Sequence, residues 1–157
     1  MKKLSLVADL LLSALFLLSG CGGEESNAIA TADTEPVNVD TIDVDLTALS
    51  STMVYGEVDN MLLVPEDYVG QVIKLRGTYS VNFYEPTGQY YHFVIISDAA
   101  ACCAQGLEFF WVGEHAYPED YPADDAEIEV TGVFERYEDD GGIYYRIRTN
   151  EVTILGA

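Results

Sequence analysis

Two adjacent cysteines, Cys102 and Cys103, are the residues of this 157-residue chain whose chemistry is most distinctive. Thiolate and imidazole ligands together suit Zn²⁺ or copper, and carboxylates can complete such sites. The chain has no C-x-x-C pair and no paired histidines, so the remaining ligands must come from separate segments. The sequence therefore suggests, as one hypothesis, a Zn or Cu site built from Cys102 and Cys103 with partners among nearby Asp98, Glu108, His92 and His115.

The same cysteine pair has two other interpretations. The Cα atoms of adjacent residues lie ~3.8 Å apart, below the usual lower limit of ~4.4 Å for a disulfide. A Cys102–Cys103 bond would therefore be strained and labile, which makes a thiol-redox protein a second hypothesis. Alternatively, the two side chains fill space beneath a turn as small apolar groups.

Aromatic residues supply a different candidate site. The chain holds 11 tyrosines and one tryptophan, and those near strand ends could line a groove for a protein, peptide or glycan ligand. The candidate ligand-binding residues are Tyr90, Tyr91, Trp111 and Tyr144, with further tyrosines at 84, 117, 121, 137 and 145. The competing interpretation is ordinary packing with hydroxyl groups at the rim.

Composition and motifs narrow the class of function. The chain carries 27 Asp and Glu against 7 Lys and Arg, a net charge of −20, which argues against nucleic acid as a partner. It contains no G-x-S-x-G, S-x-x-K, H-E-x-x-H or P-loop motif. The sequence therefore predicts a non-enzymatic binding protein, with metal binding or trafficking as the alternative.

The N-terminal segment is typical of an export signal. Met1-Lys2-Lys3 forms a short basic start, and residues 10–18 form an apolar run too short to span a bilayer. Leu18-Ser19-Gly20-Cys21 resembles the lipobox of bacterial lipoproteins. This resemblance implies removal of residues 1–20, lipidation of Cys21 with palmitate-like chains, and anchoring at the extracytoplasmic face of the bacterial cell membrane.

A tether is expected after the lipid. Residues 22–45 contain seven acids, no base and no sustained apolar period, a composition typical of disordered linkers. The predicted organisation is a signal peptide over 1–20, a lipidated Cys21 with an acidic tether to residue 45, and one folded domain over 46–157.

The folded domain has the patterns of a short helix and five strands. Apolar residues at helical spacing predict a helix over Ser50 to Leu63, and a period of two predicts a first strand over 73–83. Four more strands are predicted over 90–96, 107–112, 128–137 and 143–148, with 152–155 extending or following the last. Asp139-Asp140-Gly141-Gly142 is a hairpin signal between the last two.

This order predicts a mainly β fold, a small five-stranded OB-like barrel with a short N-terminal helix. A plain sandwich or an SH3-like barrel is the alternative.

A family resemblance covers most of the domain. The segments 53–61, 65–70, 98–109 and 117–122 together resemble a group of small, uncharacterised lipoproteins from Gram-positive, mostly clostridial bacteria. The turn with adjacent cysteines is also similar to the C-terminal OB-like domain of a permease-associated membrane protein family of unknown function. The resemblance implies the fold and the location, and it carries no established activity.

Overall fold

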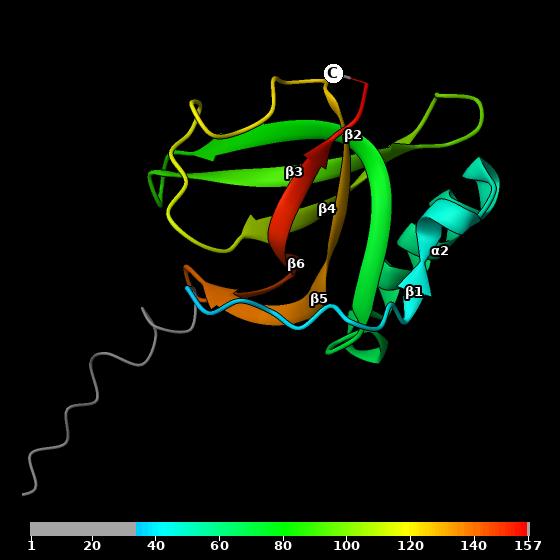
Figure 1. The fold of residues 1–157 in the computed structure, drawn as a ribbon, viewed down its shortest axis with the longest axis horizontal. Helices are drawn as coiled ribbons and strands as arrows, with labels where there is room; N and C mark the ends of the chain where they lie inside the picture. The colour runs from blue at the N-terminus through cyan, green and yellow to red at the C-terminus, as the bar shows by residue number, and fades with distance from the viewer. Residues whose placement is uncertain (1–33, 157) are drawn as a thin grey trace, which may run out of the picture.

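A long bent strand organises the molecule, whose computed structural model describes residues 34–156. That strand, β2 (Val72–Tyr84), pairs with two different strands along its length (Figure 1). The other elements are β1 (Val44–Asp45), η1 (Leu46–Ala48), α2 (Ser51–Leu63), η2 (Pro65–Asp67), β3 (Gln89–Ser97), β4 (Ala104–Trp111), β5 (Glu127–Asp139) and β6 (Gly142–Ile154).

Five strands close into a ring. The first half of β2 pairs with β5 and its second half with β3, both antiparallel. Strand β3 continues to β4, and β4 runs parallel to β6, which returns to β5 through a hairpin. Short β1 adds to β2 in parallel, so the six-stranded sheet is mixed.

Gly77 lies where β2 changes partners. A Cβ atom at this position would lie 2.4 Å from the carbonyl oxygen of Ile95 on β3, far too close for any side chain. The absence of a side chain therefore lets β2 approach β3 closely at the point where it leaves β5.

The core lies inside the ring and under α2. Alternate residues of the strands point inward, so Val94 of β3 and Leu107 of β4 are buried while their neighbours are partly exposed. Helix α2 contributes Val58 and Met61, which are both fully buried. Ser50 occupies the N-cap, but its side chain makes no capping hydrogen bond.

The predicted mainly β class, five strands and short helix are confirmed, with strand ends shifted by one to three residues in most cases. The segment 152–155 belongs almost wholly to β6, and Asp140 and Gly141 form the predicted hairpin turn. None of the helices within residues 34–156 combines the length and apolar character needed to cross a membrane.

The chain joins the folded domain earlier than predicted. Val37 and Asn150 exchange two hydrogen bonds, of 2.8 and 2.7 Å, and Arg148 donates to the carbonyl oxygen of Glu35. Asp43 is bonded to Val72 through its backbone N–H and its carboxylate. The ordered part of the predicted tether therefore begins well before Leu46. The predicted signal peptide, the predicted lipidation site Cys21 and residues 22–33 lie outside the described residues.

Candidate functional site

A cavity of about 640 Å³, here called the aromatic pocket, opens over the first residues of β3 and the last residues of β4 and β5. Its lining includes Tyr90, Tyr91, His92, Tyr117, Tyr121 and Tyr137. A second cavity of about 330 Å³ adjoins it, with Tyr84 and Tyr144 in its lining. Three of the four predicted ligand-binding residues, Tyr90, Tyr91 and Tyr144, thus line one or both cavities.

Two hydrogen-bonded pairs form a wall shared by these cavities. Tyr91 donates a short hydrogen bond to Asp139, and Tyr137 donates to both oxygens of Glu108, at 2.8 and 2.7 Å. All four residues line both cavities. The pairs hold the end of the β5–β6 hairpin against β3 and β4.

Burial changes the acid–base chemistry of this wall. Desolvation raises the pKa of Glu108 to about 7, although the Tyr137 hydroxyl and the Arg146 guanidinium both favour the carboxylate. Burial and the neighbouring Glu108 also raise the pKa of Tyr137, so its hydroxyl remains a donor. A buried carboxyl group with a pKa raised toward neutral pH therefore faces the aromatic pocket.

Arg146 is the positive charge in the pocket lining. Its guanidinium lies over the rings of Phe110 and Tyr137, 4.2 and 4.4 Å from their centroids. Its Nε donates to Glu135 at 2.7 Å. The guanidinium is thus fixed by two rings and one carboxylate, in an orientation that a flexible surface arginine would not hold.

His92 is buried in the inner wall of the pocket. Its ring stacks on Tyr121 with centroids 3.8 Å apart, and its Nδ1 lies 2.8 Å from the hydroxyl of Tyr79. Burial lowers the pKa of His92 to about 4, so the ring is neutral near pH 7.

His115 and Trp111 form a stacked pair at the edge of the pocket, with ring centroids 3.9 Å apart. His115 Nε2 lies 3.2 Å from the carbonyl oxygen of Val112, which can only accept, so this nitrogen carries the proton. Trp111 donates to the carbonyl oxygen of Asn150. Trp111 thus packs against His115, which lines the pocket, but Trp111 is not itself part of the lining.

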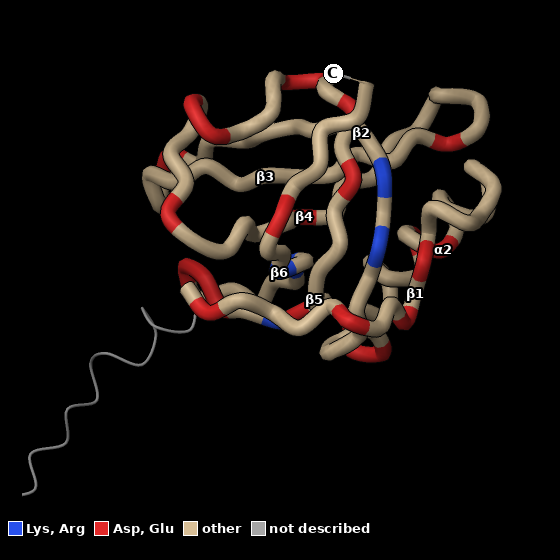
Figure 2. The backbone as a smooth tube through the Cα atoms, in the orientation of Figure 1, with Lys and Arg blue, Asp and Glu red and all other residues tan. Residues whose placement is uncertain are grey.

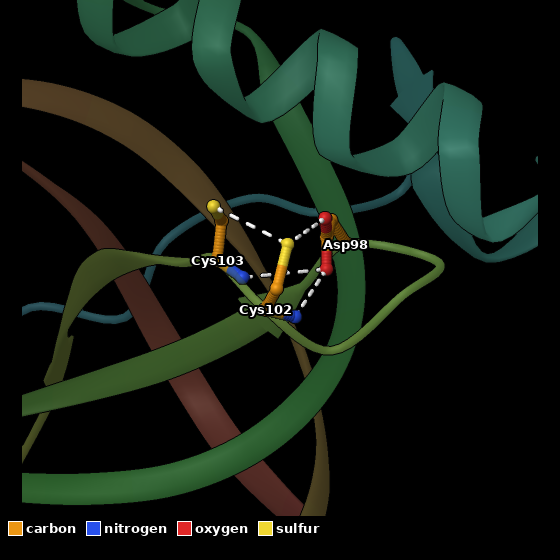
Figure 3. Close-up of side chains that lie close together, drawn as sticks. All are labelled: Asp98, Cys102 and Cys103. Carbon is orange, nitrogen blue, oxygen red and sulfur yellow. Dashed lines mark hydrogen bonds between the residues drawn. The ribbon is translucent and has the colours of Figure 1, made fainter.

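The second candidate site is the turn between β3 and β4, here called the cysteine turn (residues 98–103). Asp98, Cys102 and Cys103 lie together at its base (Figure 3). The two sulfur atoms are 3.7 Å apart, and Cys102 Sγ lies 3.2 Å from Asp98 Oδ2. Both thiols are free and exposed, so the interpretation of the cysteines as apolar filling is wrong.

The structure divides the predicted metal ligands between these two sites. Among residues 34–156, three or more candidate ligand atoms lie within 4.8 Å of one another only at Asp98, Cys102 and Cys103. The other predicted ligands, His92, His115 and Glu108, line the aromatic pocket. A single site with all six candidate ligands is therefore not assembled, because the strands carry the cysteines away from the pocket.

Several members of the pocket lining are not among the predicted site residues, and Asp139 and Arg146 are the charged ones that matter most here. In the sequence, Asp139 belongs to an acidic turn signal and Arg146 is one of a few basic residues that could share a face, so neither is predicted to line this pocket. The alternation of residues along β5 indicates that Tyr137 and Asp139 lie on one face of that strand. It does not indicate which other strands lie opposite that face. Compared with protein-family models and with curated proteins, the chain matches none.

Proposed function

We propose that this chain is a non-enzymatic, glycan-binding lipoprotein of the bacterial cell envelope, tethered through Cys21 to the extracytoplasmic face of the membrane. The ring of five strands is an OB-like barrel in this proposal, and the aromatic pocket is its ligand site. The single observation that carries the proposal is the pocket itself, with tyrosine rings around a wall of tyrosine–carboxylate pairs.

Strand order supports the OB-like interpretation. Starting at β2, the ring runs β2-β3-β4-β6-β5 and returns to β2, with β4 and β6 parallel. OB-folds are five-stranded Greek-key barrels that bind oligonucleotides and oligosaccharides on their second and third strands, between the loops 1–2 and 4–5. The corresponding parts of this chain are β3, β4 and the β2–β3 and β5–β6 turns, which is where the two cavities lie.

The pocket chemistry favours a sugar over an oligonucleotide. Its volume falls within the range of about 300–1,000 Å³ typical of small-ligand sites, which combine aromatic walls with a few oriented polar groups. Carboxylates of Glu108 and Asp139 and the guanidinium of Arg146 offer acceptors and donors for hydroxyl groups. Tyrosine rings offer flat apolar surfaces beside them.

Charge argues against a phosphate backbone. Asp and Glu occur around the whole ring, whereas Lys and Arg, drawn in blue, lie on β2 and near β5 and β6 (Figure 2). Lys74 and Arg76 both form ion pairs with Glu129, at 3.1 and 3.0 Å. Basic side chains engaged by carboxylates leave little positive potential for binding many phosphates.

The test uses the full chain carrying Cys21→Ser, so that no lipid is attached to residue 21. Calorimetric titrations with chitotetraose, mannotetraose and tetra-alanine compare two glycans with a peptide. We expect one tetrasaccharide to bind with a Kd below ~1 mM. Tyr90→Ala, which removes an exposed ring from the pocket, should weaken binding at least tenfold.

Met53→Ala provides the matched control, because it shortens an exposed apolar side chain on α2, away from both cavities. If only tetra-alanine binds, the proposed ligand would be a peptide and not a glycan. Failure of all three probes to bind would remove the support for a glycan site.

A further inference from the structure

The cysteine turn takes no part in the proposed glycan site, and its geometry points to a separate activity. We propose that Asp98, Cys102 and Cys103 form an exposed Zn²⁺ site with one coordination position open to solvent. Structural zinc sites are closed by four protein ligands, whereas three ligands leave a position for exchange. Such a site would take up and release zinc at the membrane surface.

The distance between the sulfur atoms suits zinc. Two Zn–S bonds of about 2.3 Å meeting at a tetrahedral angle place the sulfur atoms about 3.8 Å apart, and Cys102 Sγ and Cys103 Sγ are 3.7 Å apart. A disulfide would require the same atoms to approach to about 2.05 Å across a single peptide bond. The observed separation therefore fits a bridging metal better than a covalent bond.

Asp98 is held in the orientation that a third ligand needs. Its Oδ1 accepts hydrogen bonds from the backbone N–H groups of Cys102 and Cys103, at 2.9 and 3.4 Å. Its Oδ2 is left to accept from the Cys102 thiol (Figure 3). A metal ion would replace that thiol proton, and the two N–H groups would serve as the outer partners that orient metal-binding carboxylates.

The turn is a defined piece of backbone. The N–H of Asp98 donates to the carbonyl of Cys103 at 2.9 Å, and the N–H of Ala101 donates to the carbonyl of Asp98 at 3.0 Å. Immediately afterwards, Gln105 donates to Asp59 of α2 at 2.7 Å. Six consecutive residues thus hold all three ligands, and a contact with the helix fixes the strand that follows them.

Binding of Zn²⁺ to the cysteine turn requires no oxidant or reductant. Zn²⁺ displaces one proton from each thiol, and both protons pass to solvent. Two thiolates and one carboxylate then leave the loaded site with one net negative charge. Thiolate softness favours Zn²⁺ over the hard cations Mg²⁺ and Ca²⁺, which prefer oxygen ligands alone.

The test uses the full chain with Cys21→Ser, which leaves Cys102 and Cys103 as its thiols. The reduced, metal-free protein is titrated with Co²⁺ and then with Zn²⁺. We expect one Co²⁺ per chain, a thiolate-to-cobalt charge-transfer absorption, and complete displacement by Zn²⁺. Cys102→Ser and Cys103→Ser should each abolish the absorption. Asp98→Asn should weaken affinity at least ~10-fold while both thiols remain, since loss of even an outer partner of a ligand costs that much.

Asp124→Asn is the control, since it makes the same acid-to-amide change at an exposed residue outside the cysteine turn and outside both cavities, and it should leave Co²⁺ binding unaltered. Three results would overturn the zinc site: no binding while a thiol assay counts two free thiols, equal binding by Cys102→Ser, or an intact mass that is two hydrogens short in protein purified without reductant and so marks a disulfide. The glycan titrations are independent of all three, because the zinc site does not rest on the pocket.

Discussion

The two ends of β3 carry two different kinds of candidate site. At its start, Tyr90 to His92 enter a pocket completed by β4, β5, β6 and the loop 112–126. After its end, one continuous turn holds Asp98, Cys102 and Cys103. Because an extended strand rises about 3.3 Å per residue, the seven residues from Tyr91 to Asp98 separate the sites by roughly 23 Å.

The two sites obtain their chemistry from different physical sources. In the aromatic pocket, desolvation dominates, since burial raises the pKa of Glu108 and lowers that of His92. In the cysteine turn, hydrogen bonds dominate, since the Cys102 thiol lowers the pKa of Asp98 and Asp98 raises that of Cys102. The pocket therefore depends on the integrity of the whole ring, whereas the turn depends on local backbone geometry.

The largest expected difference concerns the core beneath the pocket. Phe109 is 2% exposed and packs against Tyr79 and His92. Phe109→Ala should lower the free energy of unfolding by about 3–5 kcal/mol, because it leaves a cavity under the inner wall. Equilibrium urea denaturation at constant pH measures this loss. A loss below about 1 kcal/mol would mean that the pocket is not coupled to the core.

The pH dependence of stability should reveal the buried carboxyl group. The pKa of Glu108 rises from 4.5 to about 7 on folding, so the folded protein binds more protons between those values. The contribution of Glu108 to stability is therefore complete below pH 4.5 and is lost as the pH rises to about 7, on the order of 3 kcal/mol in total.

Denaturation of wild type and Glu108→Gln across pH 4.5 to 8 isolates this effect. The pKa of Glu129 is lowered, because the ion pairs with Arg76 and Lys74 outweigh desolvation. Its contribution to stability therefore increases with pH, at lower pH than that of Glu108, and it is present in both proteins. The difference between the two curves should fall steadily with rising pH. A constant difference would show that Glu108 titrates normally.

Removal of the donor to Glu108 should have an intermediate effect. Tyr137→Phe deletes the hydroxyl that bonds both carboxylate oxygens. At pH 8 this should cost about 1–3 kcal/mol of unfolding free energy, the typical cost of an unpaired buried polar group. Tyr144→Phe, on the exposed neighbouring ring, is the matched control and should cost less. Equal losses would assign no special role to the Tyr137–Glu108 pair.

The smallest effect is expected in the cysteine turn. Cys102 is exposed and contributes no buried packing, so Cys102→Ser should leave the thermal unfolding midpoint of the metal-free protein within error of wild type. Differential scanning calorimetry on reduced samples checks this. A destabilisation approaching that of Phe109→Ala would contradict the view of the turn as a local, independent site.

Much of the fold could be predicted from residue patterns. The alternation in residues 73–83 predicts all of β2 except its two end residues. On the predicted apolar face of α2, Val58 and Met61 are buried, whereas Leu62 is exposed. The N-terminal boundary could not be predicted in this way. Val37 is bonded to Asn150, 113 residues later in the chain, and no local pattern reports such a partner.

The predicted sites show the same division. The sequence predicts that Glu108 binds metal with the cysteines, yet Glu108 lies in the middle of β4, away from the turn, and accepts hydrogen bonds from Tyr137. Trp111 was expected to contact ligand, but it donates to a backbone carbonyl beside the pocket. Tyr90, Tyr91 and Tyr144 do line the cavities. The positions of these tyrosines in the sequence do not indicate which strands lie opposite them.

The sequence by itself determined the five long strands of the sheet and the grouping of the two cysteines with Asp98, since both depend on residues near one another along the chain. Only the tertiary structure decided the aromatic pocket. Tyr91 meets Asp139 across 48 residues, and Tyr137 meets Glu108 across 29, because ring closure places β5 against β3 and β4. Periodicity can fix the face on which a side chain lies, but the partner across the sheet depends on strand order.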